Sequence, residues 1–171
     1  MMIWPLLAPL DLLVNLLAFP LAPLVALLTS ASGVSPCWAW PWLTPDNPID
    51  GDAGHISRWA SLVGKWPEVG IYCRRVAWLW RNRGYGFSVR VTGRTCSGPS
   101  SFVGDRAVSD NPFHAGACRV RNGGLWELYV VRPIFGRFYI RLRLGWKIPL
   151  TRDACTDTVA LCTHISIQYK Q

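Results

Sequence analysis

Several motifs that usually assign a small protein to an enzyme class are missing from this sequence. Its 171 residues contain no phosphate-binding loop, no nucleophile-elbow motif and no HExxH metalloprotease motif. The three histidines, His55, His114 and His164, lie far apart and form no local catalytic pattern. The sequence therefore predicts a protein that is not an enzyme and that needs no cofactor.

Closely spaced cysteine pairs are also absent. No CxxC pair occurs, so a structural zinc site is not expected. Six is an even number, which leaves disulfides open in an oxidising compartment. Spacing alone does not decide the matter, and reduced, buried thiols are the default expectation for the six cysteines, Cys37, Cys73, Cys96, Cys118, Cys155 and Cys162.

Charge is sparse and unevenly distributed. Only 16% of the residues are charged, whereas a soluble domain usually carries about 25%. Residues 1–57 contain no Lys or Arg, and residues 58–171 hold all 18 basic residues beside six acids. A part of the chain that is this basic is expected to be attracted to phosphate, on lipid headgroups or on nucleic acid.

A long apolar segment begins the chain. From Ile3 to Leu28 the only strongly polar side chains are Asp11 and Asn15, and the length suffices to cross a bilayer. A cleaved signal peptide is disfavoured, because no basic residue precedes the apolar core and the core is long. Four prolines leave two arrangements open, since each removes a backbone donor. One is a kinked span from about Leu10 to Leu28, and the other is a re-entrant hairpin broken near Phe19-Pro20.

Asp11 and Asn15 lie four residues apart and share one helical face. A carboxylate in hydrocarbon is costly, so this face should meet a partner helix, water or the headgroup zone, and an interfacial position is the simplest interpretation. The positive-inside rule places the basic part of the chain in the cytoplasm. The first basic residue, Arg58, lies some thirty residues beyond the apolar segment, which weakens that rule here.

The next segment, residues 31–54, predicts a connector, because it is rich in Gly, Pro and Ser and sustains no period. Its alternating tryptophans, Trp38, Trp40 and Trp42, would suit an aromatic belt at a membrane interface. Three acids, Asp46, Asp50 and Asp52, offer the oxygen ligands that Ca²⁺ prefers, but they lack the EF-hand spacing. Turns and helix caps explain these acids as well, so metal binding is the weaker interpretation.

Pro67-Glu68 indicates the start of a helix, and Gly84 indicates its end. One stripe of this helix is expected to be apolar, formed by Val69, Tyr72, Cys73, Val76, Leu79 and Trp80. The other side carries Arg74, Arg75, Trp78 and Arg81. A surface that combines Arg with Trp is suited to anionic headgroups, and a solvated helix face is the alternative.

Beyond Gly86 the hydrophobic period changes to two, which predicts strands. Turn residues at 122–124 and 133–136 favour antiparallel pairing of neighbouring strands. Residues 97–117 are expected to form a long loop. The predicted strands are Phe87–Arg94, Cys118–Arg121, Leu125–Arg132, Arg137–Lys147 and Thr158–Tyr169.

This alternation predicts a sheet with one apolar face, packed against the helix, and one basic face. The basic face is expected to hold Arg90, Arg119, Arg121, Arg141 and Arg143. Such a row could bind anionic lipid or an acidic protein, or simply be solvated. Nucleic acid is the weaker interpretation, because only Tyr139 and Tyr129 could provide a stacking surface.

Four strings, Trp42–Asn47, Gly51-Asp52, Trp78–Phe87 and Gly145–Lys147, resemble those of small uncharacterised proteins encoded by tailed bacteriophages. The similarity covers roughly residues 37–150. It implies a phage product that acts in or on a bacterial cell or is carried by the virion, and it carries over no functional residue.

The sequence thus predicts an α+β fold in three parts. They are an apolar membrane helix or helical hairpin at 1–30, the connector at 31–54, and a basic domain at 55–171 with a small antiparallel sheet and one or two packed helices. The expected location is the inner membrane of the bacterial host, with the basic domain in the cytoplasm, or alternatively the virion.

The expected function is that of a non-enzymatic, membrane-associated accessory protein of a phage. Its contacts to anionic lipid or a protein partner are expected through Arg74, Arg75, Trp78, Arg81, Arg90, Arg141 and Arg143. Two alternatives stay open: a virion component whose apolar N-terminus packs against other subunits, and a nucleic-acid-binding module that uses the basic sheet face. A homo-oligomer is also open.

Overall fold

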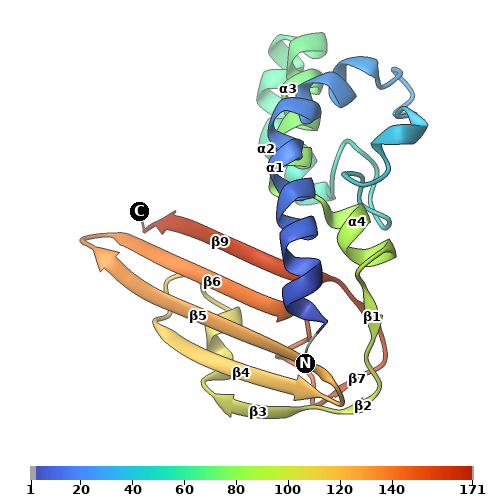
Figure 1. Cartoon of the computed structure of the whole chain (residues 1–171). Coiled ribbons are helices and arrows are strands. Elements are labelled where there is room, and N and C mark those ends of the chain that lie inside the picture. The colour runs from blue at the N-terminus through green and yellow to red at the C-terminus, as the bar shows by residue number, and fades with distance from the viewer. Residues whose placement is uncertain (1–2, 171) are drawn as a thin grey trace. The chain divides into compact units, whose positions relative to one another are not determined.

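The computed structural model describes residues 3–170 and confirms the α+β class (Figure 1). The chain forms a sheet unit, residues 3–11 and 89–170, and a helical unit, residues 12–88. This division differs from the predicted domain at 55–171, because the helices that follow the connector pack with the apolar segment. The border between the units falls inside the first helix, after Asp11.

The apolar segment forms one continuous helix, α1 (Trp4–Leu28), as Figure 1 shows. The four prolines lie inside this helix without interrupting it, so the re-entrant hairpin is wrong. Three of the four, Pro5, Pro9 and Pro20, occupy exposed positions. A proline has no N–H to donate to the carbonyl one turn earlier, and at an exposed position that carbonyl can find another partner.

The helical unit adds η1 (Cys37–Ala39), α2 (Ala53–Lys65) and α3 (Pro67–Arg81). The starts of α2 and α3 each have a physical cause. The Asp52 carboxylate caps α2 by accepting from the His55 backbone N–H at 2.7 Å. Pro67 occupies the first turn of α3, as predicted. The connector between α1 and α2 contains no other helix or strand.

The segment predicted as a strand at Phe87–Arg94 begins instead as a short helix, α4 (Tyr85–Arg90). Its apolar and polar residues alternate over too few positions to distinguish a strand from a helix. Gly86 packs so closely on the connector that a Cβ atom there would lie 2.2 Å from the Trp40 carbonyl oxygen. The Phe87 backbone N–H donates to the Pro41 carbonyl at 2.9 Å, which fixes the helix against the connector.

The buried side of α3 is rotated from the predicted stripe. Val76 and Leu79 are buried as expected, and they join the cluster formed with α1 rather than the clusters of the sheet. Arg75 and Trp78, which were predicted to lie on the outer side, are also buried. Their polar groups form hydrogen bonds inside the helical unit, and these bonds offset the free-energy cost of burying them. The residues that are exposed instead are Val69, Tyr72 and Trp80.

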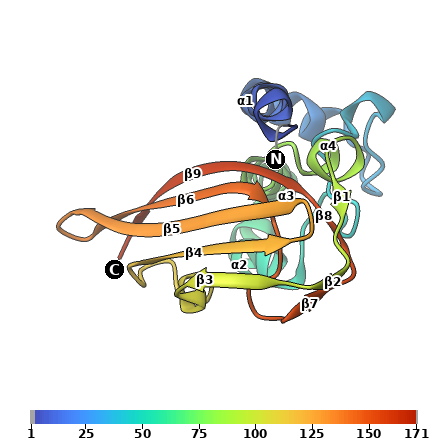
Figure 2. The same cartoon turned by 60° about the horizontal axis from the view of Figure 1, so that its bottom comes forward.

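The main sheet has five antiparallel strands in the order β3-β4-β5-β6-β9 (Figure 2). Its strands are β3 (Ser101–Gly104), β4 (Gly116–Asn122), β5 (Leu125–Phe135), β6 (Phe138–Trp146) and β9 (Leu161–Tyr169). Two short pairs flank it: β1 (Arg94–Thr95) with β8 (Thr158–Val159), and β2 (Gly98–Pro99) with β7 (Ala154–Cys155). The predicted strands after residue 117 and their pairing are confirmed. The predicted loop 97–117 is wrong in part, because it contains β2, β3 and η2 (Arg106–Ser109).

The strand register overturns the predicted basic face. Cys118 pairs with Tyr129, and Tyr129 pairs with Arg143, so these three side chains share one face of the sheet. Arg119 pairs with Leu128 and therefore lies on the opposite face. The sequence showed the alternation of side chains within each strand. It did not show the register between neighbouring strands, and the register decides which residues of different strands share a face.

Cys96 and Cys155 form a disulfide, with their Cα atoms 5.6 Å apart. It joins the segment after β1 to β7, and both residues are buried. The expectation that all six thiols are reduced is therefore wrong for this pair. The free cysteines are Cys37, Cys73, Cys118 and Cys162.

Replacing Cys96 by Ser is expected to lower the free energy of unfolding by about 4 kcal/mol, the value for closing a loop of this length. The bridged residues are 59 positions apart. Chemical denaturation in detergent measures the change. The matched control is Cys37→Ser, at an exposed free cysteine, with an expected effect within about 0.5 kcal/mol. Peptide mapping without reductant that finds both thiols free contradicts the assignment.

Candidate membrane-binding surface

Helix α1 has two very different sides. Its buried residues recur at intervals of three, four and seven positions, which places them on one narrow stripe: Asp11, Ala18, Ala22, Val25 and Ala26. The other side is formed by exposed leucines, of which Leu6 and Leu27 are 77% and 71% exposed. The other leucines of this side are Leu10, Leu13, Leu16, Leu17, Leu24 and Leu28. We call this side the leucine face.

The buried stripe consists mainly of alanines. Small side chains let another element approach the helix backbone closely, as they do where helices pack in membranes. In the helical unit this stripe packs against Trp42, Val76 and Leu79. The Trp42 indole N–H also donates to the Val14 carbonyl at 2.9 Å. The leucines therefore face outward because the alanines are the residues that fit against the protein.

At its N-terminal end, α1 is fixed within the sheet unit. Asp11 is 1% exposed, and its Oδ2 accepts a hydrogen bond from the Thr163 hydroxyl of β9 at 2.7 Å. Trp4 packs edge-on against Trp126 of β5, with 5.4 Å between ring centroids. The interfacial position predicted for Asp11 is thus replaced by a partner within the same chain. Thr163 could not be found from the sequence, because it is 152 residues away.

At its C-terminal end, α1 is held by Arg75 of α3. The Arg75 guanidinium donates to the Ser30 carbonyl at 3.0 Å and to the Thr29 carbonyl at 3.4 Å. These carbonyls follow the last turn of the helix, where backbone acceptors lack intrahelical partners and the helix dipole is negative. A buried cation at this position therefore stabilises the end of α1.

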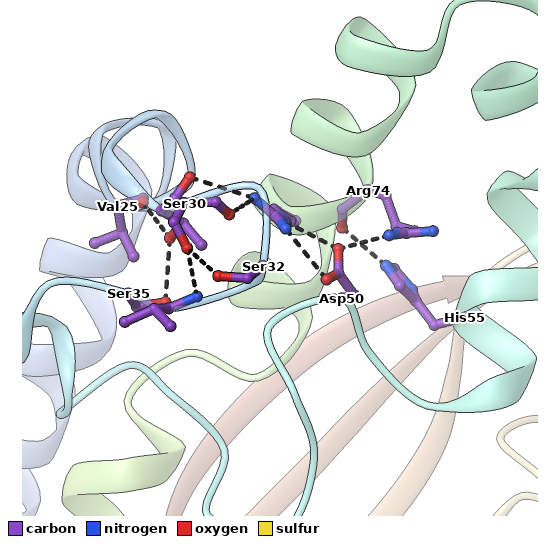
Figure 3. A network of polar contacts seen from close by, with 10 residues as sticks. Val25, Ser30, Ser32, Ser35, Asp50, His55 and Arg74 are labelled. Atoms are coloured by element: carbon purple, nitrogen blue, oxygen red, sulfur yellow. Dashed lines mark hydrogen bonds and ion pairs between the residues drawn. The ribbon is translucent and has the colours of Figure 1, made fainter.

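Asp50 neutralises the two arginines of this region (Figure 3). Its carboxylate accepts from Arg74 at 2.6 Å and from Arg75 at 2.9 Å. The ring of His55 bonds to the Arg74 carbonyl at 2.9 Å, which ties α2 to the same network. Burial raises the pKa of the Asp50 carboxyl, but the hydrogen bonds from Arg75 and Arg74 outweigh it, so the pKa lies below its ordinary value.

A proline-freed carbonyl in the middle of α1 has an aromatic partner. The Phe19 carbonyl would normally accept from the residue four positions later, which is Pro23 and has no N–H. The Trp80 indole N–H donates to this oxygen at 3.2 Å. The Arg83 guanidinium lies 4.9 Å from the centre of the Phe19 ring. An Arg and a Trp thus flank α1 halfway along its length.

The predicted contact residues differ in burial and in their partners. Arg74, Arg75 and Trp78 serve the interior of the helical unit and are not available to a ligand. Arg81 has a half-exposed side chain that lies 5.5 Å from the Trp78 ring centre and 3.6 Å from Asp52. Arg90 is exposed at the end of α4. Only these last two keep the exposure that the prediction required.

Arg141 and Arg143 lie on the face of the sheet that carries Cys118 and Tyr129, opposite the face of Arg119. Arg143 forms an ion pair with Glu127, which is fully buried. Burial raises the pKa of the Glu127 carboxyl even though Arg143 opposes that shift. Both guanidiniums lie over the ring of Tyr129, at 5.6 and 5.2 Å, and Tyr129 is buried. Tyr129, one of the two candidate stacking rings, is therefore not exposed on this face.

The metal interpretation of the three acids is not supported. Asp50 is held by two arginines, Asp52 caps α2, and Asp46 lies exposed. Within residues 3–170, no three His, Cys, Asp or Glu side chains gather closely enough to hold a metal ion. Asp52 is therefore the helix cap that the sequence offered as the alternative, whereas Asp50 serves an ion pair that the sequence did not predict.

Comparison with known proteins gives one match. A family model described as "Family of unknown function (DUF7338)" matches residues 1–171. No curated protein and no solved structure matches the chain. The match brings no activity, substrate or partner with it.

Replacing Asp50 by Asn is expected to lower the free energy of unfolding by about 3 kcal/mol at neutral pH, because Arg75 is left buried without a counter-charge. Since the folded pKa is depressed, the contribution of Asp50 is present above its ordinary pKa of 3.8 and is lost as the pH falls below it. Denaturation series at neutral and acid pH measure both effects.

The matched control is Asp46→Asn, the same chemical change at an exposed acid, which should shift stability by no more than about 0.5 kcal/mol. Equal effects of the two substitutions at neutral pH would contradict the role given to Asp50.

Proposed function

Because the chain belongs over its whole length to the family of unknown function DUF7338, which brings no activity with it, we propose a function from the structure itself. The protein is a non-enzymatic membrane protein that α1 holds in the surface of a bilayer, with its leucine face toward lipid. One observation carries this proposal: the leucines of α1 point away from the protein, while its alanines point inward.

The exposure of α1 is unlike that of the core helix of a soluble protein. Among the described residues, α1 is the one helix that is long and apolar enough to cross a membrane, a test that core helices and signal sequences also pass. Only 28% of its most apolar 18-residue window is buried, however, and a core helix is mostly buried. Full burial of an exposed leucine side chain contributes about 1.5–3 kcal/mol, and lipid would recover the part of this that the partly exposed leucines of α1 lack.

The charges along α1 favour an in-plane position over a span. Helix α3 runs antiparallel to the second half of α1, since Arg75 contacts Thr29 and Trp80 contacts Phe19. Arg83 lies beside Phe19 as well. Phe19 and Thr29 are separated by about 15 Å along the helix, half the thickness of the hydrocarbon core at about 30 Å. A perpendicular span would therefore draw charged groups into hydrocarbon, whereas an in-plane helix leaves them at the headgroups.

Exposed tryptophans around α1 suit this position. Trp80 is 40% exposed beside Phe19, and Trp38 and Trp40 of the connector are 42% and 37% exposed. Tryptophan is favoured at the membrane interface, where its ring is half in apolar and half in polar surroundings. Arg81, exposed at the end of α3, could reach anionic headgroups there.

The disulfide indicates on which side of the membrane the sheet unit lies. Persistent disulfides form in oxidising compartments, so Cys96–Cys155 favours a non-cytoplasmic position for the sheet unit. This position replaces the cytoplasmic one that the weak charge rule suggested. Phage origin stays a prediction from the sequence resemblance.

Substituting Glu for Leu13 and Leu24 together is expected to move the protein from the membrane to the soluble fraction, because two carboxylates on the leucine face oppose insertion. Both positions are exposed, so folding should be preserved. Flotation of the full chain with phosphatidylcholine vesicles measures binding, and circular dichroism checks the fold.

The matched control is Val69→Glu, at an exposed apolar position of α3, which should leave flotation unchanged. Wild-type protein that stays at the bottom of the gradient, or a double variant that floats like the wild type, contradicts the proposed function.

An in-plane helix has both ends on the same side of the bilayer. Ile3→Cys and Ser32→Cys, at exposed positions before and after α1, should both react with a membrane-impermeant maleimide added outside sealed vesicles. Peptide mass spectrometry separates these sites from the native cysteines. Labelling of only one of the two before the vesicles are lysed identifies a span and contradicts the in-plane position.

A further inference from the structure

The sheet has a second face that carries both apolar and basic side chains. The register places Arg119 opposite Leu128, Leu128 opposite Leu144, and Leu144 opposite Thr163, so these rows lie on the face opposite Glu127. We call this face the open face. Its exposed residues are Val103, Arg119, Arg121, Arg132, Phe138, Ile165, Ile167 and Tyr169.

The apolar part of the open face is concentrated on β9 and the start of β6. Ile165 and Ile167 are 60% and 66% exposed, and the rings of Phe138 and Tyr169 lie 5.1 Å apart between centroids. The adjoining turn between β5 and β6 exposes Phe135 by 80%. Contiguous exposure of large apolar side chains marks a binding surface in a natural protein.

Basic residues border this apolar area. Arg119, Arg121 and Arg132 lie on the same face, on β4 and β5, and Arg137 and Lys170 are exposed at the β5–β6 turn and the end of β9. None of these five forms an ion pair within residues 3–170 that the structure records, and the acid of the central strands, Glu127, lies on the other face. The open face is thus apolar and cationic together.

The lipid-facing helix begins on this same face. Trp4 packs against Trp126, which pairs with Arg121 and therefore lies on the open face. Asp11 accepts a hydrogen bond from Thr163, which lies in the same row of the open face as Arg119. The first turns of α1 therefore lie against the open face within the sheet unit. Leu6 and Leu10 of these turns are exposed.

We propose that the open face binds an anionic lipid surface. This inference rests on the proposed function of α1. Charge selects the occupant, because the sheet unit carries 12 basic and six acidic residues, a net charge of +6. A second copy would bring like-charged arginine rows together, whereas anionic headgroups neutralise them and the aromatic rings enter the interface.

The test compares three single-cysteine additions to the full chain by labelling with a water-soluble maleimide, with each site read by peptide mass spectrometry. Ile167→Cys reports the open face, Leu13→Cys reports α1, and Val91→Cys, which is exposed and lies outside both, is the control. Vesicles are made of phosphatidylcholine alone or mixed with phosphatidylglycerol, and detergent micelles serve as the lipid-free state.

Labelling of Ile167→Cys is expected to be slowed roughly tenfold or more by vesicles containing phosphatidylglycerol, the factor that corresponds to burying one such side chain. Neutral vesicles should protect it less, and Val91→Cys should label freely throughout. Adding Arg119→Gln, Arg121→Gln and Arg132→Gln should abolish the protection at Ile167→Cys while that at Leu13→Cys persists.

The two proposals fail in different ways. Free labelling of Ile167→Cys in anionic vesicles with Leu13→Cys still protected overturns the open-face proposal alone. Free labelling of Leu13→Cys in every vesicle overturns the function proposed for α1. Protection of Ile167→Cys in micelles that increases with protein concentration shows that a second copy covers the face, and it also overturns lipid binding there.

Discussion

A helix of 25 residues with one narrow stripe of small and polar side chains can pack against protein in only one orientation. In α1 that stripe holds the alanines, and its first buried residue, Asp11, finds a hydroxyl donor in Thr163. The last carbonyls of the helix find Arg75. Because Asp11 and the last carbonyls of α1 find their partners on the protein side, the leucines are left to face outward, and this is the observation from which the membrane position is proposed.

The arginines of the chain divide into two groups with different physical roles. Arg75 and Arg143 are enclosed with a carboxylate each, Asp50 and Glu127, and they organise the interior of the two units. An enclosed ion pair contributes mainly through what its loss would leave unpaired. Arg119, Arg121 and Arg132 on β4 and β5 are exposed and form no recorded ion pair within residues 3–170, and the strand register separates them from the enclosed ones.

Periodicity in the sequence was enough to predict the apolar helix, α3 and the strands of the sheet after residue 117. It was not enough for the short α4, where alternation over six residues fits either structure. Most of the predicted contact residues lack the exposure that the prediction assumed, because exposure depends on partners distant in sequence. Asp50 draws Arg74 and Arg75 inward from 24 and 25 residues away, and register decides the face of Arg141. The leucine face, by contrast, could have been found from the spacing of the alanines in α1.

The central claim, that α1 lies in the bilayer surface with its leucines toward lipid, is tested most directly by a nitroxide scan along α1 in vesicles. The accessibility of each label to oxygen, relative to a water-soluble nickel chelate, gives its depth. The account predicts a depth that oscillates with the helical period, deepest at Leu13, Leu16 and Leu24, with no drift from one end of the helix to the other. A depth that rises steadily to the centre of the segment and falls again, or labels that remain in water throughout, would contradict it.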